Sequence, residues 1–328
     1  MLSGKHILFI APNFFGYEEE IALELRSRGA DVDFISATPF KSTFLKAALR
    51  LKRKWVVPFL EKFFYKKILS VGKKKYDYIF VLKGEALSEN FLINLKKKYS
   101  TATFILYLWD SLENTLSLEK NIKVFDRCYS FDRVDAKKYD LNYRPLFFGK
   151  GFKREPMQQF KIGLSFVGTA HSDRYLVVSR TLSMLPADLV SYSYFFLQSR
   201  WVFYIRRLLT SAFSGAKVQD FNFLPMSKSD VQDVFKNSFS IFDIEHPLQR
   251  GLTIRSIEAL GAGKKLITTN KSIVDEDFYN SQNILILDRE GLLEIPVSFF
   301  DSPFQSVPED ICYKYSIRGW IDEIFQVK

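Results

Sequence analysis

Residues 243–270, DIEHPLQRGLTIRSIEALGAGKKLITTN, decide the fold of this chain. They begin at the end of a short apolar run, residues 238–244, and pass through a polar loop into a segment that predicts a helix beginning at Gly251. Small residues at 261–263 end this helix, and residues 265–269 predict a second strand. The order of strand, helix and strand predicts one βαβ unit of a parallel sheet.

The start of this helix predicts a binding site for an anion. Unpaired backbone N–H groups and the positive end of the helix dipole suit a phosphate, and Gly251, Leu252 and Thr253 supply such N–H groups. The guanidinium of Arg250 lies next to them in the sequence. Glu258, two turns into the helix, offers a carboxylate that can accept hydrogen bonds from the paired hydroxyls of a ribose. These residues together point to a nucleotide diphosphate.

The same stretch resembles the nucleotide-sugar signature of GT-B glycosyltransferases, in which an acidic residue, seven others and a glutamate bracket a Gly-rich helix start. Glu258 matches the second acid of that signature, whereas Arg250 occupies the position of the first, so the pattern is half matched. The variant QRGLTIRSIEALGAGKKLITTN is most similar to bacterial glycosyltransferases that build lipopolysaccharide, O-antigen or capsule. An ordinary βαβ unit with a Gly-rich turn is the alternative interpretation.

This resemblance implies an α/β chain with the GT-B fold, in which two Rossmann-like domains face a cleft and a C-terminal helix returns to the first domain. The length of 328 residues fits two domains of about 150 residues each. We expect an acceptor-side domain at 1–150, a nucleotide-sugar-binding domain at 151–315 and the returning helix at 316–328. A linker rich in charge, Pro and Gly, residues 145–159, separates the two halves.

Cysteine content and the N-terminus predict a cytoplasmic location. The only two cysteines, Cys128 and Cys312, are far apart in apolar contexts, which argues against a disulfide framework and fits a reducing compartment. Residues 1–16 have too short an apolar run for a signal peptide and are better interpreted as a first strand. The sequence has no apolar run that approaches the length of a membrane span.

A basic segment, residues 41–75, carries a net charge of +11, whereas the whole chain carries +10. It holds twelve Lys and Arg against one acid, Glu61, and its apolar residues recur near helical spacing around Pro58. Two basic amphipathic helices of this kind favour peripheral binding to an anionic membrane surface, which here would be the inner face of the cytoplasmic membrane. Residues 194–213 form a second candidate patch. A solvated helix face is the alternative, and nucleic acid is the weaker one because no nucleic-acid-binding motif accompanies the charge.

Strand and helix signals alternate through the first half and predict a parallel sheet. We expect strands at 6–12, 31–36, 76–82, 101–109 and 124–130, and helices at 17–27, at 88–98 and near Leu118. Functional groups gather at the carboxyl ends of strands in such sheets. The residues that follow these predicted ends, and that we place on the acceptor side, are Gly16, Glu85, Asp110, Ser111 and Asp132.

The second half begins with a strand at 162 that ends at Gly168 and Thr169, where the chain turns into a helix. We expect backbone N–H groups at this turn to face the cleft where the nucleotide binds, and Arg174 can pair with its phosphate. Further strands are expected at 189–194, 218–221 and 239–244, and a last helix is expected at 317–325.

Breaking a sugar–phosphate bond leaves growing negative charge on the diphosphate. Arginines fixed beside the diphosphate stabilise this charge and so lower the activation barrier of the reaction. The candidates are Arg174, Arg250 and Arg255. Asp110 is our candidate for the general base that accepts the proton of the acceptor hydroxyl, with an N-cap as the alternative role. The Glu258 helix resembles the retaining class.

No metal or other cofactor is expected, and the donor is a nucleotide-sugar that acts as substrate. The three histidines, His6, His171 and His246, are scattered, and no Cys/His ligand spacing occurs. The predicted acceptor is a lipid-linked saccharide or polysaccharide.

Two other functions remain open. A nucleotide-sugar epimerase uses the same fold but has no need of a basic aromatic segment, and a non-catalytic assembly subunit would keep the fold without binding a nucleotide. A dehydrogenase is the weakest candidate because the first turn, residues 11–16, lacks the G-x-G-x-x-G spacing.

Overall fold

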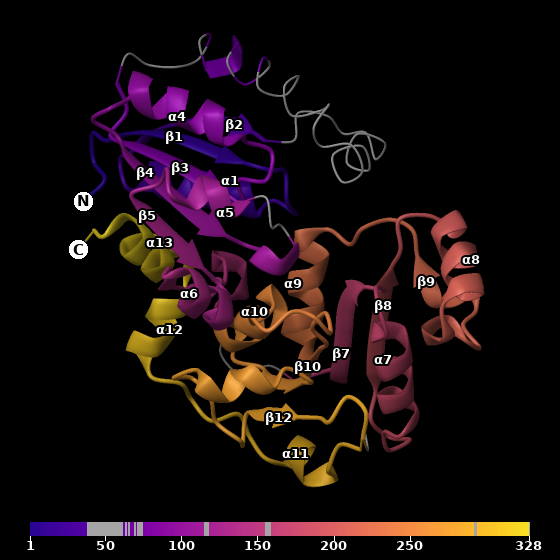
Figure 1. Cartoon of the computed structure of the whole chain (residues 1–328). Coiled ribbons are helices and arrows are strands. Elements are labelled where there is room, and N and C mark those ends of the chain that lie inside the picture. The colour runs from indigo at the N-terminus through magenta and orange to yellow at the C-terminus, as the bar shows by residue number, and fades with distance from the viewer. Residues whose placement is uncertain are drawn as a thin grey trace. The chain divides into compact units, whose positions relative to one another are not determined.

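The computed structural model describes residues 1–37, 62, 64, 66–68, 70, 75–114, 118–154, 159–291 and 294–327 (Figure 1). The chain divides into two compact units, Met1–Pro145 with Ile317–Lys328 and Leu146–Ser316. Most of the basic segment 41–75 lies outside the described residues, so its amphipathic helices stay a prediction. No helix of the described part of the chain is long and apolar enough to cross a membrane.

The first unit is built on a parallel sheet with strand order β2-β1-β3-β4-β5-β6. Its strands are β1 (His6–Ala11), β2 (Asp31–Ser36), β3 (Tyr78–Leu82), β4 (Thr103–Leu108), β5 (Arg127–Ser130) and β6 (Asn142–Tyr143). The central strands are apolar and buried along almost their whole length, because helices cover both faces of such a sheet. The predicted alternation of the first half is therefore confirmed.

Two of the four described helices that follow strands of the first unit begin at a side-chain cap. The four are α1 (Tyr17–Ser27), α4 (Glu89–Lys98), α5 (Glu119–Ile122) and α6 (Arg133–Tyr139). The Ser88 hydroxyl accepts from the N–H of Phe91 to start α4, and the Asp132 carboxylate accepts from two N–H groups to start α6. Gly16 stands before α1 with φ of 79°, a left-handed conformation that suits glycine.

The C-terminal helix, α13 (Ile317–Phe325), belongs to the first unit, as the resemblance implies. Its Trp320 is fully buried, with ring centroids 4.7 Å from Tyr107 and 6.0 Å from Phe80. Arg28, the C-cap of α1, donates to the carbonyl of Arg318 at 2.7 Å and also pairs with Asp322. The helix that ends the chain thus completes the core of the unit in which the chain begins.

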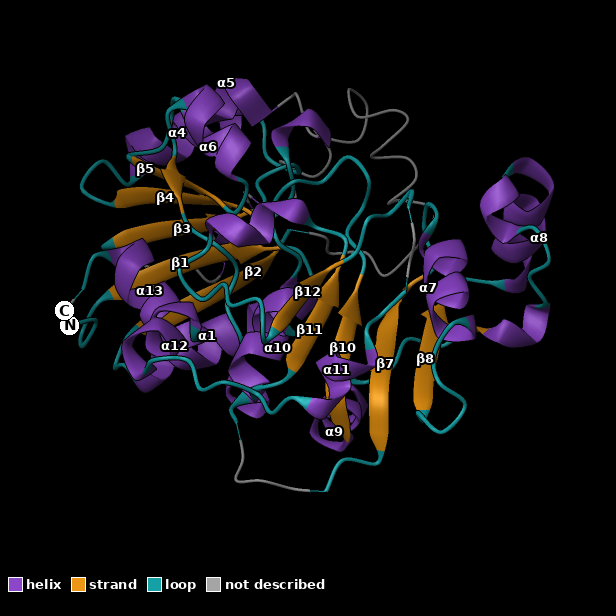
Figure 2. Ribbon diagram, turned by 90° about the horizontal axis from the view of Figure 1, so that it is seen from below, coloured by secondary structure: helices purple, strands orange, loops and turns teal. Residues whose placement is uncertain are grey.

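The second unit, Leu146–Ser316, has a parallel sheet of order β12-β11-β10-β7-β8-β9 (Figure 2). Its strands are β7 (Ile162–Thr169), β8 (Ser191–Phe196), β9 (Phe221–Asn222), β10 (Ser238–Asp243), β11 (Lys265–Thr268) and β12 (Ile284–Ile286). Its helices are α7 (Arg174–Ser183), α8 (Arg200–Leu209), α9 (Lys228–Asn237), α10 (Ile254–Ala262), α11 (Val297–Asp301) and α12 (Glu309–Tyr315). Strand β10, helix α10 and strand β11 form the predicted βαβ unit.

Two predicted elements of this unit are wrong. The predicted strand at 218–221 is displaced: Val218–Asp220 form a 3-10 turn, in which the Asp220 carboxylate accepts from the N–H of Lys217 at 2.8 Å, and strand β9 begins only at Phe221. Helix α10 begins at Ile254 rather than at Gly251, because Thr253 is its N-cap and its hydroxyl accepts from the N–H groups of Arg255 and Ser256.

Candidate functional site

The sheet of the second unit has one topological switch point, between β7 and β10, from which the strand order runs in opposite directions. Ligands of open α/β sheets bind in the crevice outside the carboxyl ends of the strands at such a point. Thr169 ends β7 and Asp243 ends β10, so the loops that follow them, together with the starts of α7 and α10, form the candidate site.

Arg174 is fixed at this edge by both strands. It is the first residue of α7, and its side chain donates to the carbonyls of Ile244 at 2.5 Å and of Thr169 at 3.3 Å. A Cβ on Gly168 would lie 3.5 Å from the Arg174 guanidinium and 3.0 Å from the Phe166 ring, so glycine lets the strand approach closely. Burial lowers the pKa of Arg174 to about 10, and the group is still charged at neutral pH.

Asp243 joins the end of β10 to the start of α10. Its buried carboxylate accepts from the hydroxyls of Thr253 at 2.5 Å and Ser256 at 2.6 Å. Thr253 in turn accepts from the N–H of Arg255 at 3.1 Å. The predicted binding residue Thr253 therefore acts on the helix start through its side chain, which accepts from the N–H groups of Arg255 and Ser256.

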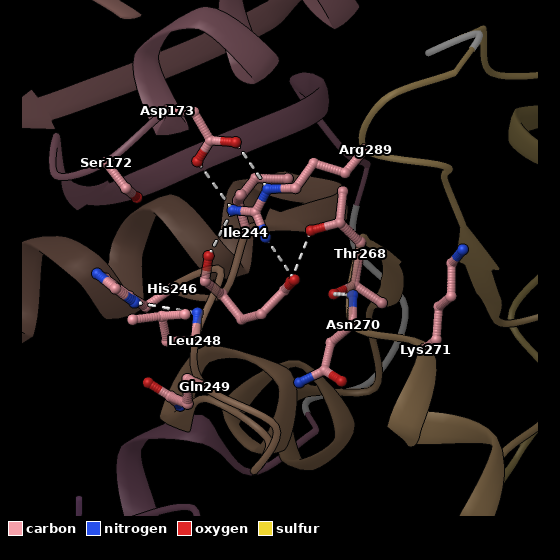
Figure 3. A network of polar contacts seen from close by, with 12 residues as sticks. Ser172, Asp173, Ile244, His246, Leu248, Gln249, Thr268, Asn270, Lys271 and Arg289 are labelled. Atoms are coloured by element: carbon pink, nitrogen blue, oxygen red, sulfur yellow. Dashed lines mark hydrogen bonds and ion pairs between the residues drawn. The ribbon is translucent and has the colours of Figure 1, made fainter. Parts of the chain in front are cut away.

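A network of charged side chains lies at the same edge of the sheet of the second unit (Figure 3). Arg289, in the loop after β12, donates to Asp173 at 2.8 Å and 3.1 Å and to the Glu245 carboxylate at 2.6 Å. The other oxygen of Glu245 accepts from the hydroxyl of Thr269 at 2.6 Å. Burial raises the pKa of Glu245, which Thr269 and Arg289 partly offset. Arg289, Glu245 and Asp173 are not among the site residues predicted from the sequence.

Arg255 and Glu258 pair with each other on α10. The guanidinium of Arg255 donates to the Glu258 carboxylate, which is fully buried, and its Nε lies 3.4 Å from the carbonyl of Val167. The i, i+3 spacing brings the two side chains together on one face of the helix. A ribose-binding role for Glu258 stays a prediction.

Arg250 is the exposed cation of the site. Its carbonyl accepts from the Ser272 hydroxyl at 2.5 Å and from the Asn270 amide at 3.4 Å, which places its loop beside the carboxyl end of β11. Within the described residues its guanidinium has no hydrogen-bond or ion-pair partner. Gly251 and Leu252 are buried in the same loop. The charge of Arg250 is therefore available to an anionic ligand.

His171 and His246 lie side by side at this edge, with ring centroids 5.2 Å apart. Burial, followed by the positive charge of Arg174, lowers the pKa of His171 to about 3. Burial also lowers the pKa of His246. Both rings are therefore neutral at physiological pH.

The lowered pKa of His171 predicts a loss of stability in mild acid. In the unfolded chain this histidine has a pKa of 6.5 and binds a proton below that pH. In the folded chain it binds the proton only when the pH falls to about 3. The free energy of unfolding should therefore fall below pH 6.5, by up to about 1.4 kcal/mol per pH unit for this one group. Urea titrations between about pH 7 and about pH 5 should show a steeper decline for the wild type than for His171→Asn. Parallel declines would contradict the assignment.

The residues predicted for the acceptor side all follow strand ends of the first unit. Asp110, after β4, is 43% exposed and pairs with Lys83, which follows β3. Glu85 is exposed, Ser111 is buried, and Asp132 is buried as the N-cap of α6. The N–H of Leu112 donates to Asp135 at 2.6 Å, not to Asp110. Asp110 and Glu85 are the acids of this set that are at least partly exposed after a central strand, and Asp110 stays the predicted base.

The described residues contain no group of three or more His, Cys, Asp or Glu side chains that could hold a metal ion.

Comparison with protein-family models and with curated proteins finds no match to this sequence. Solved structures do match it. Alr3699/HepE of Anabaena, in complex with UDP-glucose, aligns with a TM-score of 0.59 at 11% identity over 98% of each chain. AviGT4, a glycosyltransferase involved in avilamycin A biosynthesis, aligns with a TM-score of 0.61 at 8% identity over 98% of this chain and 96% of that one. The lipopolysaccharide outer core galactosyltransferase WaaB aligns with a TM-score of 0.51 at 13% identity over 98% and 99%.

These neighbours share the architecture of two Rossmann-like sheets with flanking helices, so the predicted GT-B fold is confirmed. At such low identity the likeness extends to the fold and not to the activity.

Proposed function

We propose that this chain is a glycosyltransferase that moves a sugar from a nucleotide-sugar donor to a lipid-linked or polysaccharide acceptor. The observation that carries the proposal is the fixed cation Arg174 at the switch point of a GT-B sheet, where an anionic ligand binds in open α/β folds. The neighbour Alr3699/HepE has UDP-glucose bound, which supports a nucleotide-sugar as the donor.

The reaction breaks the bond between the anomeric carbon of the sugar and the diphosphate oxygen. Negative charge then grows on the diphosphate, and preorganised positive groups stabilise that charge in the transition state. Arg174 is held in place by two carbonyls, and Arg250 is exposed in the loop beside the carboxyl end of β11 in the same sheet. Because these side chains supply the needed positive charge, we propose a metal-independent reaction.

The acceptor and the stereochemistry are further parts of the proposal. The likeness of α10 to the retaining class supports a retaining outcome, with Arg250 standing where that class has its first acid. A lipid-linked acceptor implies work at an anionic membrane surface, on the inner face of the cytoplasmic membrane. WaaB, a lipopolysaccharide galactosyltransferase, supports this acceptor class by fold alone.

A thermal-shift screen against UDP, GDP, CMP, dTDP, ADP and NAD, with and without Mg²⁺, tests the donor class. A ligand at 100 times its dissociation constant stabilises the folded state by about 2.7 kcal/mol, which such a screen detects. We expect a shift with a nucleoside diphosphate that does not depend on Mg²⁺. A shift with none of them would contradict the transferase and favour a non-catalytic assembly subunit.

Replacing Arg250 with alanine should weaken binding of that nucleoside diphosphate about tenfold, because one charge-assisted contact to phosphate is lost. The side chain is exposed, so the fold should be unaffected. Calorimetric titration measures the change, and Arg180→Ala, at an exposed position near the end of α7 in the same unit, is the matched control. Equal affinities of the two variants would remove Arg250 from the site.

A further inference from the structure

Helix α8 turns a row of large apolar side chains outward. Trp201, Tyr204, Ile205, Leu208 and Leu209 are between 53% and 85% exposed. Steps of three and four residues place them on one face of the helix. Figures 1 and 2 both show α8 at the rim of the second unit, beyond β8. A continuous apolar face of this kind on a folded protein marks an interaction surface.

The opposite face of α8 fixes this orientation. Phe203 is buried and its ring lies 5.2 Å from that of Phe221, while Ser199 caps the helix. The guanidinium of Arg206 donates to the carbonyl of Ala170 at 2.6 Å. Because the inner face is held by these contacts, the apolar face cannot turn inward without breaking them.

The charge around α8 is all of one sign. Between Asp188 and Asp220 the chain has four basic residues and no acid, and the basic residues are Arg200, Arg206, Arg207 and Lys217. Arg200 and Arg207 are exposed. Two copies of this face would bring like charges together, whereas an anionic lipid surface complements both the apolar row and the flanking cations.

We propose that α8 docks the second unit on an anionic bilayer, lying in the plane of the interface. Trp201 and Tyr204 have the amphipathic rings that prefer the headgroup level, and Ile205, Leu208 and Leu209 reach toward the acyl chains. The exposed guanidinium groups of Arg200 and Arg207 pair with lipid phosphates. This surface is separate from the basic segment 41–75.

The docking has a consequence for the site, and this consequence rests on the proposed function. Arg206 bonds α8 to Ala170, the residue directly after β7, so the switch point is attached to the docking helix. A donor bound there is held near the bilayer, where a lipid-linked acceptor resides. The docking itself does not depend on the transferase activity.

Vesicle binding with a local probe tests this proposal. The full chain in a Trp55→Phe background keeps Trp109 and Trp320, which are buried, and Trp201, which is exposed. With vesicles of phosphatidylcholine mixed with phosphatidylglycerol, we expect Trp201 emission to move to shorter wavelength and to be quenched by brominated lipid. Phosphatidylcholine alone should have a much smaller effect, because the charge contribution is absent.

A pair of variants controls for charge. Leu208→Glu places a charge on the apolar face and should lower the vesicle affinity about tenfold or more. Val297→Glu makes the same charge change at an exposed apolar residue of α11 in the same unit and should leave the affinity unchanged. Both side chains are exposed, so both variants should fold and keep the nucleotide-induced thermal shift.

Several results would overturn the docking. Equal vesicle affinities for Leu208→Glu and the wild type, or binding without any change in Trp201 emission, would assign the membrane contact to another segment. A concentration-dependent dimer that Leu208→Glu breaks, with no vesicle binding, would assign the face to a second copy. If no nucleotide raises the melting temperature of the wild type, the proposed function is contradicted. The docking result does not depend on that outcome.

Discussion

Replacing Trp320 with alanine should lower the free energy of unfolding by about 3–5 kcal/mol, the usual cost of removing a fully buried tryptophan. The side chain is 0% exposed and contacts the rings of Tyr107 and Phe80, from two central strands of the first unit. Its loss leaves a cavity between α13 and the sheet, which the rigid neighbours fill only in part. Urea denaturation followed by far-UV circular dichroism measures the change.

The matched control is the same substitution at Trp201, which is 78% exposed on α8. Without lipid, Trp201→Ala should change the free energy of unfolding by no more than about 0.5 kcal/mol. If the two units unfold in separate transitions, the decrease in the free energy of unfolding of Trp320→Ala should appear in the transition of the first unit. Similar small effects of both substitutions would mean that α13 contributes little to the first unit.

The strands and helices of the first unit follow from local signals. Helix α1 and strand β2 have the predicted bounds, and α13 matches the predicted helix at 317–325. Each of these segments has an apolar period that only one regular structure satisfies, and glycines at 16 and 29 mark the ends of α1. Burial on a sheet then reinforces what the local pattern already favours.

The arrangement of the site does not follow from local signals, because it depends on contacts between distant residues. Arg289 meets Asp173, which is 116 residues away, and Glu245, which is 44 residues away. No spacing rule predicts such a network before the loops after β7, β10 and β12 are placed at one edge of the sheet. The start of α10 shows the same effect, since Asp243 selects Thr253 as the N-cap from ten residues away.

Glu258 is an instructive exception, because a local signal was present. Its carboxylate is predicted to bind a ribose, yet Arg255 lies three residues earlier on the same helix face and pairs with it. A buried carboxylate on a helix needs a partner, and an arginine at i−3 satisfies that need without a ligand. The spacing predicts the ion pair, whereas the ribose role rests on the carboxylate as an acceptor for paired hydroxyls and on the resemblance.

Asp110→Asn should lower the rate of sugar transfer by about 10²–10⁴-fold while leaving nucleotide binding unchanged, the usual contribution of a general base. Asparagine keeps the shape of the side chain but cannot accept the proton of the acceptor hydroxyl. Asp110 is partly exposed at the end of β4, and its partner Lys83 follows the neighbouring strand β3. A partly exposed ion pair contributes about 0–1 kcal/mol, so the variant should fold.

Asp126→Asn is the control for this substitution, because it removes the charge of a similarly exposed acid in the same unit. Asp126 is 42% exposed and pairs with Lys96 at 2.7 Å, but it precedes β5 rather than following a strand of the sheet. Single-turnover assays with a saturating donor should give wild-type rates for Asp126→Asn and strongly reduced rates for Asp110→Asn. Retained turnover in Asp110→Asn would remove its role as the base. A parallel loss of nucleotide binding would mean that Asp110 supports the folded site instead of the proton transfer.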